Sequence, residues 1–106
     1  MLRIVIRPRA AADLEEATDY YTLQASPEVA ERFVKEFENA CSLLAERPGI
    51  GSRRFAHLMP GSLRTWSLDR FPFRVFYLVE DGTLQIVAVD HERRDVTSSV
   101  FLSRPL

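Results

Sequence analysis

The chain has 106 residues, of which 46% are hydrophobic and 27% charged, and this is the size and composition of one globular domain, expected to span residues 1–106. Its formal net charge of −1 argues against general binding of polyanions, and its single cysteine, Cys41, rules out an internal disulfide. The apolar run at the N-terminus is short and interrupted by arginines, so we expect no signal peptide, no membrane span and a cytoplasmic location.

Residues 2–7 predict a β-strand, because they form a run rich in β-branched residues that ends at Pro8. Proline is well placed at the first position of a helix, and apolar residues then recur at steps of three and four. These residues are Ala10, Leu14, Ala17 and Tyr21. They predict an amphipathic helix with one face toward the core.

A second helix is predicted to begin at Ser26, which can cap its N-terminus, with Pro27 in the first turn. Its apolar residues again follow a spacing of three and four, and they are Ala30, Phe33, Phe37, Ala40 and Leu44. This helix is expected to end near Arg47, because a proline and a glycine follow. Two helices joined by a few residues predict an antiparallel hairpin.

The second half of the chain changes to the alternating pattern of β-strands. Residues 48–62 contain two prolines and three glycines, so we expect a loop with no regular structure. Strands are predicted at 64–68, 73–79 and 84–89, with a tight turn at 81–82 between the last two. The strand over 73–79 is apolar on both faces, which is typical of a central strand covered on both sides.

This order of elements, strand, helix, helix, strand, strand, strand, predicts an α+β fold. The helical hairpin is expected to pack on one face of a mainly antiparallel four-stranded sheet, and a short C-terminal segment follows. The core is expected to contain the large apolar residues of both layers, which are Phe33, Phe37, Leu44, Trp66, Phe73, Phe76 and Tyr77. We expect Tyr20 and Tyr21 to pack within the helical hairpin.

Several short sequence motifs follow one another along nearly the whole chain. They are Ala10–Leu14 with the pair Tyr20-Tyr21, the helix start at Ser26-Pro27, and the stretches 48–51, 61–64, 71–77 and 87–95. This ordered set resembles the RelE/ParE superfamily of toxins from type II toxin–antitoxin systems, and its ParE-like branch more than its RelE-like branch. The resemblance implies the fold, a cognate antitoxin as partner, and growth inhibition.

The two branches imply different activities. ParE-like toxins are associated with poisoning of DNA gyrase, whereas RelE-like toxins are ribosome-dependent ribonucleases. Cleavage of RNA needs a group that takes a proton from a 2′-hydroxyl and cations near the charged phosphorane. Where RelE-like enzymes carry strand lysines this chain has Thr65 and Ser67, and the place of their tail tyrosine falls near Val96 and Thr97. We therefore favour a gyrase poison over an enzyme.

Two alternatives stay open. In a ribosome-dependent mRNA endoribonuclease, the catalytic residues would be Arg74, His91 and Arg93. A non-toxic relative would only bind a partner. No cofactor is expected, and no metal site, because His57 and His91 stand alone and Cys41 lies within a helix.

The basic residues are unevenly distributed, and this points to a surface for the target. Thirteen of the fourteen are arginines, and net charge is −4 over residues 1–46 but +3 over residues 47–106. An anionic partner is therefore expected to meet the second half. The candidates for target contact are Arg64, Arg74, His91, Arg93 and Arg94. For Arg74, an ion pair with Asp69 is an equally good interpretation.

The antitoxin is expected to cover apolar surface that a small domain leaves exposed. The candidate contacts are Leu23, Val29 and Val34 on the helices and Val100, Phe101 and Leu102 near the C-terminus. A segment that folds on binding could wrap around these residues.

Overall fold

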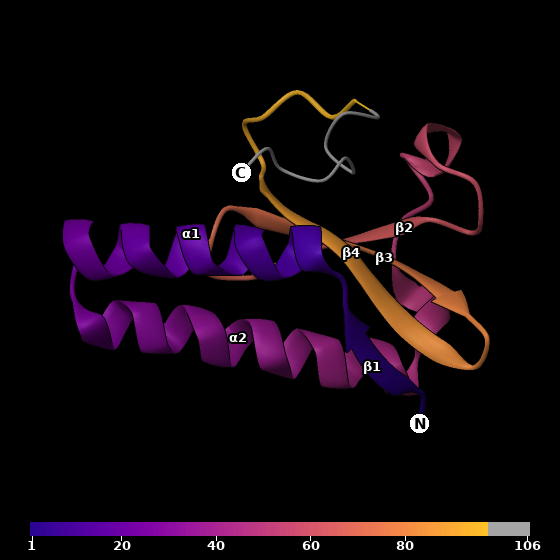
Figure 1. Ribbon diagram of the computed structural model, residues 1–106, viewed down its shortest axis with the longest axis horizontal. Helices are drawn as coiled ribbons and strands as arrows, with labels where there is room; N and C mark the ends of the chain where they lie inside the picture. The colour runs from indigo at the N-terminus through magenta and orange to yellow at the C-terminus, as the bar shows by residue number, and fades with distance from the viewer. Residues whose placement is uncertain (98–106) are drawn as a thin grey trace.

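Within residues 1–97, which the computed structural model describes, four strands form one sheet and two long helices lie against one of its faces (Figure 1). The elements are β1 (Arg3–Ile6), α1 (Pro8–Gln24), α2 (Pro27–Glu46), β2 (Arg64–Ser67), β3 (Phe73–Glu80) and β4 (Thr83–His91). The strand order is β1-β4-β3-β2, in which β1 runs parallel to β4 and the other two pairs are antiparallel. This confirms the predicted α+β fold.

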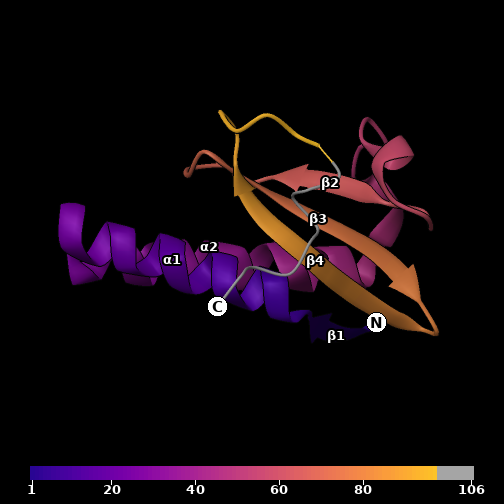
Figure 2. The same cartoon turned by 45° about the horizontal axis from the view of Figure 1, so that its top comes forward.

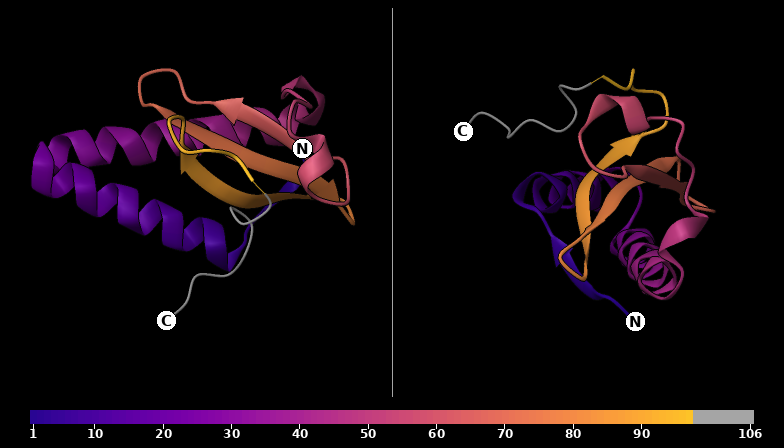
Figure 3. Two further views of the ribbon diagram at one scale, coloured as in Figure 1. Left: turned by 90° about the horizontal axis from the view of Figure 1, so that it is seen from above. Right: turned by 90° about the vertical axis from the view of Figure 1, so that its right-hand side faces the viewer.

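The two helices begin and end where the proline and capping residues in the sequence predict. Pro8 lies in the first turn of α1, and the Ser26 Oγ accepts a hydrogen bond of 3.2 Å from the Val29 N–H at the start of α2. The Ser26 N–H in turn donates to the Tyr21 carbonyl at 3.0 Å, which closes α1. The resulting hairpin extends beyond the sheet at its far end (Figure 3). In the described part of the chain, neither helix is long and apolar enough to cross a membrane.

The sheet is covered on both faces, as the apolar strand at 73–79 predicts. On the helix side, one core cluster joins Phe33, Phe37 and Leu44 to Val75, Tyr77, Leu84 and Ile86 of the sheet. On the other side, a second cluster is formed by Leu63, Phe76, Leu78, Val87 and Ala88, with Phe55, Met59 and Val96 packed against it. Figure 2 shows the later part of the loop between α2 and β2, which carries Phe55 and Met59, and residues 92–97 after β4 on the side of the sheet away from the helices.

The prediction that residues 48–62 lack regular structure is wrong in part. Two short 3₁₀ helices occur there, at Pro48–Ile50 and Ala56–Leu58. The loop must follow the sheet closely, because the Phe55 ring packs on Phe76 with centroids 5.8 Å apart. Short 3₁₀ turns let such a loop satisfy its backbone, as in the bond of 3.1 Å from the Leu58 N–H to the Phe55 carbonyl.

The expectation that both tyrosines pack within the hairpin is correct for Tyr21 only. The Tyr21 ring contacts the rings of Phe33 and Phe71, with centroids 5.4 Å and 5.1 Å away. Tyr20 is 59% exposed. The reason is the helical repeat, since Tyr20 lies about 100° around the helix from the apolar stripe that ends at Tyr21.

An aspartate on α1 completes the pairing of β4. The strand β1 ends at Ile6, opposite Ile86, so within residues 1–97 the outer edge of β4 has no partner strand beyond that point. Instead, the Asp13 Oδ2 accepts a hydrogen bond of 2.9 Å from the Val89 N–H. Asp13 itself is buried and forms an ion pair of 2.9 Å with the Nε of Arg9. This contact holds the first half of α1 against the sheet.

Candidate functional site

Arg74 lies on the face of the sheet away from the helices. It pairs across the sheet with Asp90, and the side chains of such a pair share one face. The Arg74 Nη2 donates to the Glu92 carbonyl, and its Cζ lies 5.4 Å from the centroid of the Phe55 ring. Within the described residues, the alternative ion pair with Asp69 is not formed.

Arg64 lies on the opposite face of the sheet. It pairs with Tyr77, whose ring belongs to the helix-side core. The Arg64 Nη1 donates to the Gly51 carbonyl at 2.9 Å, which ties this side chain to the loop. The single arginine surface expected from the sequence is therefore divided between the two sides of the sheet.

His91 ends β4 on the helix side. Its ring packs edge-on against Phe73, with centroids 5.2 Å apart, and its Nδ1 accepts a hydrogen bond of 3.0 Å from the Arg93 N–H. An endoribonuclease would need a base and cations around one phosphate. The structure places His91 and Arg74 on opposite faces and does not bring them together.

Arg93 and Arg94 follow β4 in a tight turn. The Arg94 N–H donates to the His91 carbonyl at 3.0 Å, and the Arg94 Nη1 lies 3.3 Å from the Asp90 Oδ1. Arg93 is exposed, and within residues 1–97 its side chain has no hydrogen bond or ion pair. Arg93 is therefore accessible to a partner, whereas Arg94 is engaged with a buried carboxylate.

A groove on the side of Arg74 contains residues that the sequence analysis did not single out. It is lined by Ile50, Ser52, Arg54, Phe55, Thr65, Trp66, Ser67, Arg74 and Glu92. The Arg54 Cζ lies 4.9 Å from the centroid of the Phe55 ring, so two guanidinium groups flank one aromatic ring. The doublet Arg53-Arg54 before an aromatic residue was the available signal in the sequence.

The three candidate antitoxin contacts that the structure describes do not form one patch. Leu23 is 81% exposed near the end of α1, and Val29 and Val34 are half-buried on α2. Val29 lines a groove with Phe71, whereas Val34 lines a different groove between the two helices. Val100, Phe101 and Leu102 lie outside the described residues.

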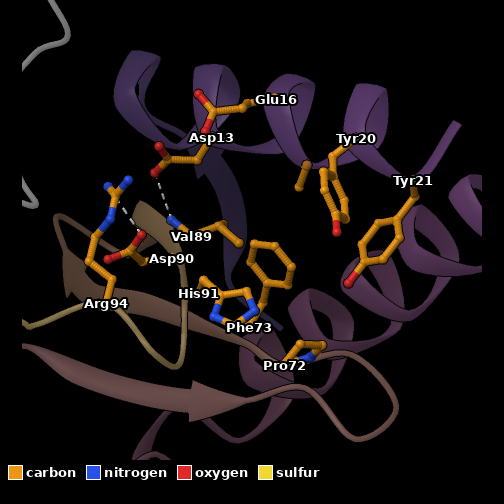
Figure 4. Close-up of a pocket in the computed structure, with 11 residues that line it drawn as sticks. Asp13, Glu16, Tyr20, Tyr21, Pro72, Phe73, Val89, Asp90, His91 and Arg94 are labelled. Carbon is orange, nitrogen blue, oxygen red and sulfur yellow. Dashed lines mark hydrogen bonds and ion pairs between the residues drawn. The ribbon is translucent and has the colours of Figure 1, made fainter. Parts of the chain in front are cut away.

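A pocket opens between α1 and the end of β4 (Figure 4). Its lining residues are Asp13, Glu16, Ala17, Tyr20, Tyr21, Pro72, Phe73, Val89, Asp90, His91 and Arg94. Tyrosine and phenylalanine rings line one end, and Asp90 lies beside Arg94 at the other. Asp90 is 5% exposed, and among residues 1–97 its Oδ2 has no hydrogen-bond partner.

The described residues include few groups suited to nucleophilic or metal chemistry. Burial raises the pKa of the Cys41 thiol from 9.0 to about 12, with a smaller contribution from the charge of Glu38, so the thiol stays protonated at neutral pH. Burial also raises the pKa of Tyr21 and of Tyr77. Among residues 1–97, no group of three or more acidic, histidine or cysteine side chains could hold a metal ion.

Known proteins resemble this chain over most of its length. The sequence profile of a family described as "ParE toxin of type II toxin-antitoxin system, parDE" matches residues 4–96. Toxin ParE1 of Mycobacterium tuberculosis, in strains CDC 1551 / Oshkosh and H37Rv, is 33% identical over 95 residues, which cover 89% of this chain and 93% of the relative. A solved structure described as "Chromosomal ParDE TA system from P. aeruginosa" is 29% identical, with a TM-score of 0.72, and the match covers 86% of this chain and 96% of that one.

Proposed function

The chain belongs to the family of ParE toxins of type II toxin–antitoxin systems, and on this premise we propose that it inhibits growth by acting on DNA gyrase and is neutralised by a cognate antitoxin. The family match supports the proposal over nearly all of the described chain. Gyrase is the target associated with this branch of the superfamily. The alternative is a ribonuclease, which is the activity of the RelE-like branch.

The observation that carries the choice between these targets is the separation of Arg74 from His91. These two residues and Arg93 are the candidates that the sequence analysis names for cleavage of RNA. Register places Arg74 on the side of the second core cluster and His91 on the side of Phe73. A ribonuclease needs its proton acceptor and its cations at one phosphate, and here the side chains of His91 and Arg74 leave the sheet on opposite faces. This arrangement favours a toxin that acts by binding.

The antitoxin partnership is supported by the relative whose structure is described as a ParDE system. It is also supported by the exposed side chains of α1, since Tyr20 is 59% and Leu23 81% exposed. Exposed apolar side chains next to a pocket are typical of a binding surface. We propose that the antitoxin covers this side of α1.

The target is tested with purified chain and purified gyrase. If the proposal is correct, supercoiling of relaxed plasmid falls as the chain is added, and the antitoxin restores it. Primer extension on transcripts from induced cells should show no codon-linked cuts. Unchanged supercoiling together with such cuts would identify the ribonuclease instead. Induction without growth arrest would support the alternative that the chain is a non-toxic relative that only binds a partner.

A further inference from the structure

The pocket between α1 and β4 has the chemistry of a site for one amphipathic cation. We propose that it receives an arginine side chain of the antitoxin, with the guanidinium at the acidic end beside Asp90 and the apolar stem along the aromatic rings (Figure 4). This inference rests on the proposed antitoxin partnership, and it names the group that the pocket recognises.

The buried carboxylate of Asp90 is the first observation. Its Oδ1 has an ion pair with Arg94, whereas its Oδ2 is buried and has no hydrogen-bond partner in the part of the chain that the structure describes. A carboxylate oxygen removed from water without a donor is unfavourable, so a donor brought by a ligand is favourable. Arg74 lies opposite Asp90 on β3 but directs its guanidinium to the Glu92 carbonyl.

The surrounding charges favour a cation over a neutral donor. Glu16 is exposed on α1 and lines the same pocket as Asp13 and Asp90. Arg94 is the basic residue in this lining, and its side chain is 49% exposed. An incoming guanidinium would compete with the half-exposed side chain of Arg94 for the carboxylate of Asp90.

The aromatic end of the pocket explains why the cation should be carried on a long apolar stem. Tyr20, Tyr21 and Phe73 all line the pocket, and the rings of Tyr20 and Tyr21 meet edge to face with centroids 5.4 Å apart. The methylene groups of arginine can pack on such rings while its planar head forms paired hydrogen bonds to carboxylates. Lysine offers the charge without the planar fork.

The test uses N-acetyl-arginine amide as the probe and N-acetyl-citrulline amide as its uncharged isostere. Both are titrated into the full-length ¹⁵N-labelled protein and followed by NMR. The arginine compound should shift the amides of Ala17, Tyr21, Val89 and Asp90 in a saturable manner, and the citrulline compound should not. Equal shifts with both compounds, or shifts centred on another acidic surface, would overturn the proposal.

Three variants assign the effect to the pocket. Asp90→Asn should weaken binding of the probe about tenfold, which corresponds to the loss of one charge-assisted hydrogen bond. Glu16→Gln, at an exposed position of the pocket lining, should also weaken it. Arg94→Gln removes the competing internal cation and should strengthen binding, a change that a purely structural role of Asp90 would not produce. Glu38→Gln, at an exposed position outside this lining, is the matched control.

The same variants test the antitoxin as the occupant. The cognate antitoxin should bind Asp90→Asn at least about tenfold more weakly than wild type and Glu16→Gln severalfold more weakly, and it should bind Glu38→Gln normally. Unchanged affinity for both pocket variants would overturn the inference while leaving growth arrest by the wild-type chain intact. A wild-type chain that arrests no growth would instead contradict the proposed function, whatever the probe shows.

Discussion

The Tyr77 hydroxyl accepts a hydrogen bond of 2.9 Å from the Gly51 N–H, in the space that a side chain at Gly51 would occupy. The same hydroxyl donates to the Pro48 carbonyl at 2.7 Å. One phenol on β3 thus fixes the loop where it leaves α2. A Cβ at Gly51 would lie 2.7 Å from the Tyr77 Cε1, closer than real Cβ atoms come to such a neighbour.

We predict that Gly51→Ala destabilises the protein by about 1–3 kcal/mol, the usual cost of forcing extra atoms into a packed site. Backbone strain is not the cause, because Gly51 has a φ of −71° that alanine adopts readily. Urea unfolding measures the change. The matched control is Gly49→Ala, where an added Cβ meets nothing within 4 Å. Equal effects of the two substitutions would show that the contact with Tyr77 does not matter.

The Cys41 thiol predicts a loss of stability at high pH. Burial raises its pKa from 9.0 to about 12, so the unfolded chain loses a proton that the folded protein keeps. The contribution of the protonated thiol to the free energy of unfolding is fully present below pH 9.0 and is lost as the pH rises toward 12. Between about pH 8 and about pH 10.5, wild type should lose about 2 kcal/mol more unfolding free energy than Cys41→Ala. Parallel losses in the two proteins would contradict this origin.

The contact between Asp13 and Val89 predicts different effects for two substitutions at one position. Asp13→Ala leaves the buried Val89 N–H without an acceptor and deprives Arg9 of a carboxylate, and should cost about 2–4 kcal/mol. Asp13→Asn keeps a carbonyl oxygen and should cost less than half as much. Hydrogen exchange at the Val89 amide is the specific readout. Protection there that survives Asp13→Ala would show that the bond does not secure the edge of β4.

Elements set by local chemistry could be predicted from the sequence, and contacts set by register could not. The proline and serine at the start of α2 and the apolar face of α1 are local signals, and both helices form where these signals lie. The contact between Asp13 and Val89 joins residues 76 positions apart, and no local pattern encodes it.

The division of the arginines between two faces depends on strand register in the same way. Between Phe76 and Tyr77 the pairing with β4 shifts, from Ala88 to Ile86. Val87 and Ala88 therefore both face the second core cluster, against the simple alternation of a strand. The sequence shows which residues of one strand share a face, but which residues of neighbouring strands share a face depends on the register. For this reason the sequence alone could not show whether Arg64 and Arg74 lie on the same face of the sheet.

The groove around Phe55 gives the last prediction, which concerns the proposed target. Arg54 and Arg74 flank the Phe55 ring, and neither forms an ion pair within the described residues. Two guanidinium groups without a carboxylate partner favour an anionic contact. If gyrase is engaged here, Arg54→Gln combined with Arg74→Gln should raise the concentration needed for half-inhibition of supercoiling about tenfold or more.

Two controls separate this groove from charge in general. Arg32→Gln removes an exposed charge on α2, and Arg64→Gln removes a half-buried charge on the other face of the sheet. Each should inhibit gyrase as wild type does, because neither residue lines the groove. Circular dichroism and urea unfolding would confirm that all variants are folded. If Arg64→Gln weakens inhibition as much as the double substitution, the target contacts the helix side of the sheet, and the groove has no part in it.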